Sequence, residues 1–329
     1  MEFVSFAEAM DSQPARLARL ESELDARLTE FPAEIVPWRA GETVVLAAMG
    51  AAHHSTHAFA RLLRAAGIRA LPLIASEGRG LEAASLGDHV VVVSESGRSP
   101  EPIEFARAFA AGRRMAITND PAAPVAEIAD AVIELGDLPD SRAYTVGFTA
   151  MLVAYRGLAR ALGIASGSGS IAAEVGDALQ RFVRPADDFA HVLAGASSID
   201  VIGAGHSFAA AAEIALLSRE CLRIPASAYS THQYLHGPME SVDGSTTVIL
   251  IGDSRERAIP DSLGRSGATC ITIGRAHDGE LADFDTGRAD GLARVAVEVL
   301  AGQRLMAAAI GRLPFEIEEF VHSQTDTKV

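Results

Sequence analysis

Lysine is almost absent from this sequence: of 28 lysine and arginine residues, only Lys328 is a lysine. A Schiff base between a protein and a carbonyl substrate needs a protein amine such as lysine. That chemistry is therefore limited to Lys328, the penultimate residue, and chain ends are often poorly ordered.

Cysteine and positive charge are also scarce. Cys221 and Cys270 are the only cysteines, and they show no Cys-x-x-Cys spacing. The formal net charge of −15 repels nucleic acid and acidic membrane surfaces. The first residues, Met1-Glu2-Phe3-Val4, do not begin a basic and then apolar leader. We therefore expect a reduced, cytoplasmic protein that binds neither nucleic acid nor membranes.

Aromatic residues make up only 5% of the chain, whereas hydrophobic residues make up 49%. Cores of alanine, valine, leucine and isoleucine are typical of buried parallel strands that are covered by helices. A chain of 329 residues is long enough for two domains with separate cores. The composition therefore favours an α/β protein.

Strand and helix patterns alternate in two successive series. The first series predicts strands at 43–49, 70–74, 90–93, 115–118 and 131–135 and helices at 53–66, 103–111 and 145–162. The second predicts strands at 199–202, 247–251 and 270–273 and helices at 207–222 and 292–311. The expected segments are an N-terminal helix (1–31), a first lobe (32–163), a linker and one connecting helix at 171–193 (164–195), a second lobe (196–314) and a tail (315–329). We predict two tandem, doubly wound, flavodoxin-like lobes, each a parallel sheet flanked by helices, with ligands at the carboxyl ends of the strands.

A serine-rich loop, Ser94-Glu95-Ser96-Gly97-Arg98-Ser99, lies between the strand at 90–93 and Pro100. Unpaired N–H groups and a partial positive charge at a helix N-terminus, together with hydroxyls, surround an anion with donors. Gly97 permits a tight turn, and Pro100 suits the first helical turn. The loop predicts a phosphate site, although a serine-rich helix cap without a ligand would look the same.

The second lobe has Gly252-Asp253-Ser254-Arg255 at the corresponding place. Asp253 would oppose a phosphate, so we expect one phosphate site per chain.

Two further patterns argue against a cofactor and a metal. Gly203-Ala204-Gly205-His206-Ser207-Phe208 follows a strand, but Phe208 replaces the third glycine of a dinucleotide loop and no well-placed acidic residue follows. The pairs His53/His57 and His232/His236 lack an intervening glutamate and an obvious third ligand. We predict no cofactor and no metal ion.

Glu220 and His236 are the candidates for proton transfer. Glu220 falls late in the helix at 207–222, and His236 precedes Gly237-Pro238, which fixes a turn. A carboxylate and an imidazole suit general acid–base chemistry near neutral pH. A surface glutamate and a turn histidine that never meet would have the same sequence.

The two lobes, the Ser-x-Ser-Gly-x-Ser loop and the 16-residue spacing from Glu220 to the His236-Gly237-Pro238 turn resemble the sugar isomerase (SIS) family. The resemblance is to the double-SIS isomerase half of glucosamine-6-phosphate synthase and to standalone amino-sugar-phosphate deaminases and deglycases. It implies that Glu220 moves a proton between sugar C1 and C2. It also implies that His236 assists ring opening from the neighbouring subunit, and hence a homodimer.

This sequence also departs from the family pattern at several positions. The family's tail lysine aligns with His322, which becomes a third candidate catalytic residue, and the lysine before the catalytic glutamate is Arg219. Two Thr/Ser positions of the first glycine loop are Ala51 and Ala52. The substrate-binding residues implied are Ser94, Glu95, Ser96, Ser99, Gly50, Ala52, Arg142, Tyr144, Thr145 and Arg219, of which Arg142 suits an acidic substituent.

These features favour an enzyme, a phosphosugar isomerase/deaminase that acts on an amino-sugar 6-phosphate with release of ammonia and without glutaminase activity. A fructose-amino acid 6-phosphate deglycase is the alternative. A third possibility is a regulator that binds a sugar phosphate without turnover. The presence of both Glu220 and His236 weighs against the regulator.

Overall fold

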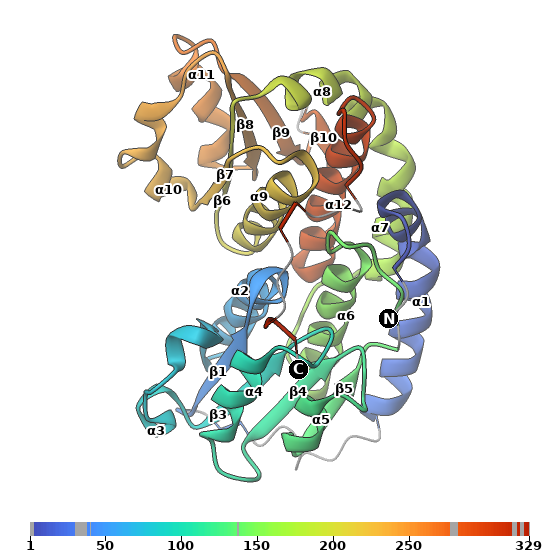
Figure 1. The fold of residues 1–329 in the computed structure, drawn as a ribbon, viewed down its shortest axis with the longest axis vertical. Coiled ribbons are helices and arrows are strands. Elements are labelled where there is room, and N and C mark those ends of the chain that lie inside the picture. The colour runs from blue at the N-terminus through green and yellow to red at the C-terminus, as the bar shows by residue number, and fades with distance from the viewer. Residues whose placement is uncertain are drawn as a thin grey trace.

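The computed structural model describes residues 3–29, 38–39, 41–136, 138–276, 282–317, 321–322 and 326–328. Two parallel five-stranded sheets form two lobes, one above the other in Figure 1. The strand orders are β2-β1-β3-β4-β5 in the first lobe and β7-β6-β8-β9-β10 in the second. Both lobes therefore have the same topology, which confirms the predicted duplication.

The first lobe alternates strands with helices, and most of its strand residues are buried. The strand β3, for example, is buried along its whole length, as expected for the middle of a parallel sheet. The elements are β1 (Thr43–Ala48), α2 (Gly50–Ala65), β2 (Arg69–Ile74), α3 (Ala83–Leu86), β3 (His89–Val93), α4 (Pro100–Arg107), β4 (Arg114–Thr118), α5 (Pro124–Ile128), β5 (Ala131–Glu134) and α6 (Val146–Ala161).

The second lobe repeats this alternation with shorter outer elements. Its short edge strand β7 and its helices α10 and α11 have no counterpart in the sequence-based prediction. The elements are β6 (Ser198–Gly203), α9 (Ser207–Leu222), β7 (Ala226–Tyr229), α10 (Thr231–Tyr234), β8 (Thr246–Ile251), α11 (Ile259–Leu263), β9 (Thr269–Gly274), β10 (Phe284–Asp285) and α12 (Gly291–Ile310).

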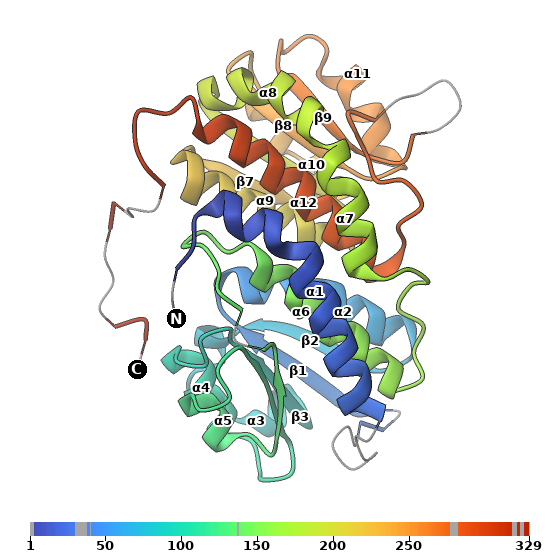
Figure 2. The ribbon, with the colours of Figure 1, turned by 90° about the vertical axis from the view of Figure 1, so that its right-hand side faces the viewer.

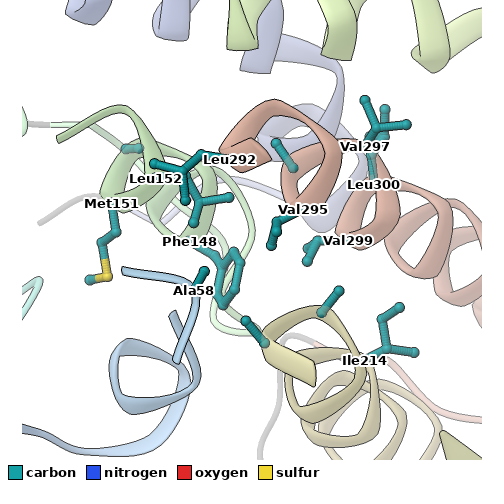
Figure 3. Close-up of a cluster of buried hydrophobic side chains, with 14 of the residues drawn as sticks. Ala58, Phe148, Met151, Leu152, Ile214, Leu292, Val295, Val297, Val299 and Leu300 are labelled. Carbon is teal, nitrogen blue, oxygen red and sulfur yellow. The ribbon is translucent and has the colours of Figure 1, made fainter. Parts of the chain in front are cut away.

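A shared helical layer joins the two lobes. The long helix α1 (Phe6–Thr29) packs on α6 and α7, and α12 packs on α9, α8 and α7 (Figure 2). One hydrophobic cluster runs through both lobes, and Figure 3 shows Ala58 of α2, Phe148 of α6 and Val295 of α12 pointing into the same space. A Cβ atom at Gly302 would come within 2.3 Å of Ile214, so this glycine permits the close approach of α12 and α9.

The connecting segment differs from the prediction. Instead of one helix at 171–193, the chain forms α7 (Ile171–Arg181) and α8 (Val183–Gly195), which meet at Phe182. Pro185 explains the break, because its ring has no N–H and clashes with the carbonyl four residues earlier. The expected boundary at residues 31 and 32 lies outside the described residues. No described helix has both the length and the apolar character of a membrane span.

Candidate functional site

The serine-rich loop has the geometry that its sequence predicts. It connects β3 to α4, Ser99 is the N-cap of α4, and Pro100 occupies the first helical turn. Gly97 has φ +62°, and a Cβ atom there would lie 2.5 Å from the Cβ of Ala123. Both its backbone conformation and this close approach therefore require glycine.

The loop forms one wall of a cavity of about 780 Å³, which we call the loop cavity. The cavity lies at the carboxyl ends of β3 and β4, where ligands of open parallel sheets bind. Its lining consists of Phe3, Glu95, Ser96, Arg98, Asn119, Asp120, Pro121, Asp140, Ser141, Arg142, Tyr144 and Lys328.

The side chain of Glu95 is half-buried and lines the loop cavity. The Nδ2 of Asn119 donates to its Oε1 at 3.3 Å. Burial raises the pKa of Glu95 to about 7, Asp140 raises it further, and Lys328 and the hydrogen bond from Asn119 oppose the rise. Near neutral pH the loop therefore carries only part of the negative charge that its sequence suggests, which lowers the repulsion of an anion.

Asp140 holds the N-terminus of α6 beside this loop. Its carboxylate accepts backbone N–H groups of Ser141, Thr145, Val146 and Gly147 at 2.7 to 3.3 Å. Burial raises the pKa of Asp140 to about 6, and these N–H groups oppose the rise. Asp140 therefore satisfies helix donors that would otherwise be free to meet an anion.

The three candidates of the segment before α6 have different environments. Arg142 is exposed on the cavity wall, with its guanidinium 5.1 Å from the centre of the Phe3 ring. The buried hydroxyl of Tyr144 has no hydrogen-bond partner among the described residues. Thr145 is fully buried, and its hydroxyl donates to the carbonyl of Ala143 at 2.8 Å, so its side chain is already committed within the protein.

Gly50 and Ala52 lie at the start of α2 and line neither this cavity nor the one around Glu220. Gly50 is exposed with φ +52°, and Ala52 is buried. Their assignment to the substrate site stays a prediction.

Glu220 lines a second cavity, of about 450 Å³, which we call the Glu220 cavity. Its Oε2 atom is buried without a hydrogen-bond partner among the described residues. Burial raises the pKa of Glu220 to about 8, Glu213 raises it further, and Arg219 opposes the rise. The lining is Arg219, Glu220, Arg223, Ile224, Pro225, Val321 and His322, so Glu220 and His322 share one cavity; a catalytic role for His322 stays a prediction.

Half-buried His54 and buried Glu213 form a pair between the facing helices α2 and α9. The Nδ1 of His54 on α2 is 3.0 Å from the Oε2 of Glu213 on α9. Burial lowers the pKa of His54 to about 4 and raises that of Glu213, so burial favours the uncharged form of both groups. Glu213 also raises the pKa of Tyr144 and of Glu220, which places it electrostatically between the two cavities.

The structure does not bring all the predicted catalytic residues together within one chain. His236 is exposed after α10, next to Gly237 with φ +141°, and it does not line the Glu220 cavity. The serine loop and Glu220 also line different cavities. Within the described ranges, no group of three histidine, cysteine or acidic side chains is arranged to hold a metal ion.

The family comparison gives a match to the second lobe. Residues 192–284 match the family model of the SIS domain. This chain contains a SIS domain. The match does not extend to the first lobe, so a second SIS domain there stays a prediction that the repeated strand order supports. No curated protein matches the chain.

Three solved structures share the whole fold of this chain. Tagatose-6-phosphate ketose/aldose isomerase from Escherichia coli aligns with a TM-score of 0.78 and 18% identity over 97% of this chain and 96% of that one. The C-terminal domain of glucosamine-fructose-6-phosphate aminotransferase from Francisella tularensis gives 0.76 and 17% over 93% and 95%. Glucosamine-6-phosphate deaminase from Thermotoga maritima gives 0.71 and 19% over 94% and 97%. These similarities establish the fold.

Several site residues were missed by the sequence analysis. Asn119 and Asp120 follow β4, the neighbour of β3, so the meeting of carboxyl ends at one sheet edge would have indicated them. Phe3 and Lys328 come from distant ends of the chain, and no local pattern indicates their place. His54 and Glu213 carry no motif, and only the packing of α2 on α9 pairs them.

Proposed function

We propose that this protein is a phosphosugar isomerase/deaminase that converts an amino-sugar 6-phosphate to a ketose phosphate and ammonia, without glutaminase activity. The observation that carries the proposal is the loop cavity, which combines the hydroxyl of Ser96 with cationic side chains beside the N-terminus of α4. We place the phosphate there, against Ser96; Ser94 and Ser99 belong to the same loop but do not line the cavity, and their contact with the phosphate stays a prediction. The names of the similar structures, two of which act on sugar phosphates or amino-sugar phosphates, support this choice.

Proton transfer is assigned to Glu220. In the open-chain sugar, Glu220 removes the proton from C2 and returns it to C1, which leaves an imine at C2. Water adds to that imine, and ammonia leaves. A buried carboxyl with a pKa of about 8 exchanges protons in the physiological range, which supports this role.

His322 and His236 complete the proposed site. His322 lies in the cavity of Glu220 and assists proton transfer to the sugar oxygens. His236 is exposed, which suits a residue that a homodimer partner contributes for ring opening. Because the two cavities are separate within one chain, the proposal requires the sugar to reach from the serine loop to Glu220 in the assembled dimer.

The test is incubation with a panel of amino-sugar and glycated-amino-acid 6-phosphates while ammonia and amino acid release are measured. Ammonia release from an amino-sugar 6-phosphate, lost in Glu220→Gln, is the expected result. Binding of the panel without turnover would instead favour a sugar-phosphate-binding regulator.

One observation favours a second candidate, the fructose-amino acid 6-phosphate deglycase. The guanidinium of Arg142 faces the loop cavity and has no carboxylate partner among the described residues, so it suits the carboxylate of an amino acid leaving group. Release of amino acid rather than ammonia, with a KM that rises in Arg142→Gln, would identify this activity.

A further inference from the structure

The only lysine of the chain contacts the serine-rich loop. The Nζ of Lys328 donates to the Oγ of Ser96 at 2.7 Å, across 232 positions of sequence. Both residues line the loop cavity. A residue of the C-terminal tail therefore lies at the centre of the proposed phosphate site.

The end of α12 and the C-terminal end of the chain lie in different lobes. The helix α12 ends at Ile310 in the upper part of the molecule, whereas the C-terminal end lies beside α4 of the lower lobe (Figures 1 and 2). The contact therefore joins the tail that follows the second lobe to the loop of the first.

The charges around the loop cavity distinguish Lys328 from the other cations. Arg98 forms an ion pair with Asp120 at 3.2 Å, and Arg142 lies over the ring of Phe3. Among the described residues, Lys328 has no carboxylate within ion-pair distance, and its contact is a neutral hydroxyl. Its charge lowers the pKa of Glu95 against the effect of burial. Lys328 thus brings to this loop a positive charge that no described residue holds in an ion pair.

We propose that Lys328 is a phosphate-binding residue, whose ammonium group donates one hydrogen bond to Ser96 and another to the phosphate of the substrate. An ammonium has three donors, so both contacts are possible at once. Docking of the tail and binding of the phosphate then stabilise each other. This inference rests on the proposed function only in taking a phosphate ester as the ligand.

Chemical modification provides a direct test, because Lys328 and the N-terminal amine are the only alkyl amines in the chain. The full-length protein is acetylated with and without inorganic phosphate, and both sites are quantified by mass spectrometry. We expect phosphate to slow acetylation of Lys328 at least about fivefold while the N-terminal amine, as internal reference, reacts at an unchanged rate. Equal rates at Lys328 under conditions in which phosphate is bound would overturn the inference.

Binding measurements with matched variants provide a second test. Lys328→Gln is expected to weaken inorganic phosphate binding about tenfold and to raise the KM of a turned-over phosphosugar with little change in kcat, because one charge-assisted hydrogen bond is lost. Lys328→Arg keeps the charge and should restore most of the affinity. Arg312→Gln, which removes an exposed charge outside both cavities, should bind as the wild type does.

The outcomes separate this inference from the proposed function. If the wild type binds phosphate and Lys328→Gln binds it equally well, Lys328 is not a ligand and the serine loop suffices. If the wild type binds neither inorganic phosphate nor any phosphosugar, the proposed function itself is wrong, and the role of Lys328 is overturned with it.

Discussion

The two lobes have the same strand order, but the loops after β3 and β8 are chemically opposite. In the first lobe the loop presents the hydroxyl of Ser96 to a cavity of about 780 Å³. In the second, Asp253 accepts the backbone N–H of Arg275 at 2.7 Å and forms an ion pair with Arg294, while the buried Glu256 accepts the N–H of Ser254 at 3.2 Å. The second lobe thus satisfies its own donors with carboxylates.

This comparison shows that two lobes with the same backbone fold need not have the same binding site. The carboxyl ends of the strands offer an anion position in both lobes, since the geometry is shared. In the second lobe, carboxylates of the protein itself take up the donors at this position and would oppose an anion in the adjacent cavity of about 230 Å³, whereas the first lobe keeps donors available. The corresponding helices of the two lobes also differ. The helix α9 carries Glu213 and Glu220, whereas α2 carries His54, whose pKa burial lowers to about 4.

The largest effect is expected from a variant that removes proton transfer in the second lobe and leaves binding in the first lobe intact. Glu220→Gln keeps the shape of the side chain but removes its acid–base function, so kcat should fall about 10²–10⁴-fold with a smaller change in KM. The control is Glu240→Gln, an exposed position of the same lobe. Full turnover by Glu220→Gln would mean that the second lobe does not carry the chemistry.

A smaller effect is expected from removing the hydroxyls that distinguish the two loops. The double variant Ser96→Ala/Ser99→Ala loses donors to a phosphate and should raise KM about 10- to 100-fold with kcat largely preserved. Ser254→Ala in the second lobe is the matched control and should leave KM unchanged. Equal effects of the two changes would contradict the assignment of a single phosphate site.

Asp253, a carboxylate held inside the second lobe, should contribute to the stability of the fold rather than to activity. Burial acts to raise the pKa of Asp253, but Arg294 and the N–H of Arg275 outweigh it, and the pKa lies below its ordinary value of 3.8. Asp253→Asn should therefore cost about 1–2 kcal/mol in the free energy of unfolding at neutral pH. Because the folded pKa is depressed, this difference should shrink as the pH falls below the ordinary value, which denaturant titrations at several pH values would reveal.

The smallest effect is expected from a change in the electrostatic environment of Glu220, and it concerns the pH dependence of kcat. If Glu220 acts as a base, kcat should rise with pH along a limb centred near its pKa of about 8, because only the ionised form accepts a proton. Arg219 lowers this pKa, so Arg219→Gln should move the limb to higher pH, by an amount that the exposure of Arg219 keeps small. A limb that moves to lower pH, or does not respond, would contradict this arrangement.

Much of the fold follows from local patterns, and the failures have identifiable causes. The helix expected at 207–222 is α9, because its alanine-rich stretch between Gly205 and the αL residue Arg223 has clear ends. The break at Phe182 was missed because periodicity alone does not register the effect of Pro185 on the previous turn. The serine loop was recognisable because strand, glycine and proline are contiguous in sequence. The His54–Glu213 pair was not, because its members are 159 positions apart.

By itself, the sequence determined the alternation of strands and helices, the duplication of the lobes and the position of the serine loop, because these depend on residues that are neighbours along the chain. Only the tertiary structure decided that Lys328 contacts Ser96, that Asp253 is held by Arg294, and that Glu220 lies with His322 but apart from the loop cavity. These contacts join residues from separate elements. Their distances and pKa values depend on how the lobes and the tail pack, which no local pattern encodes.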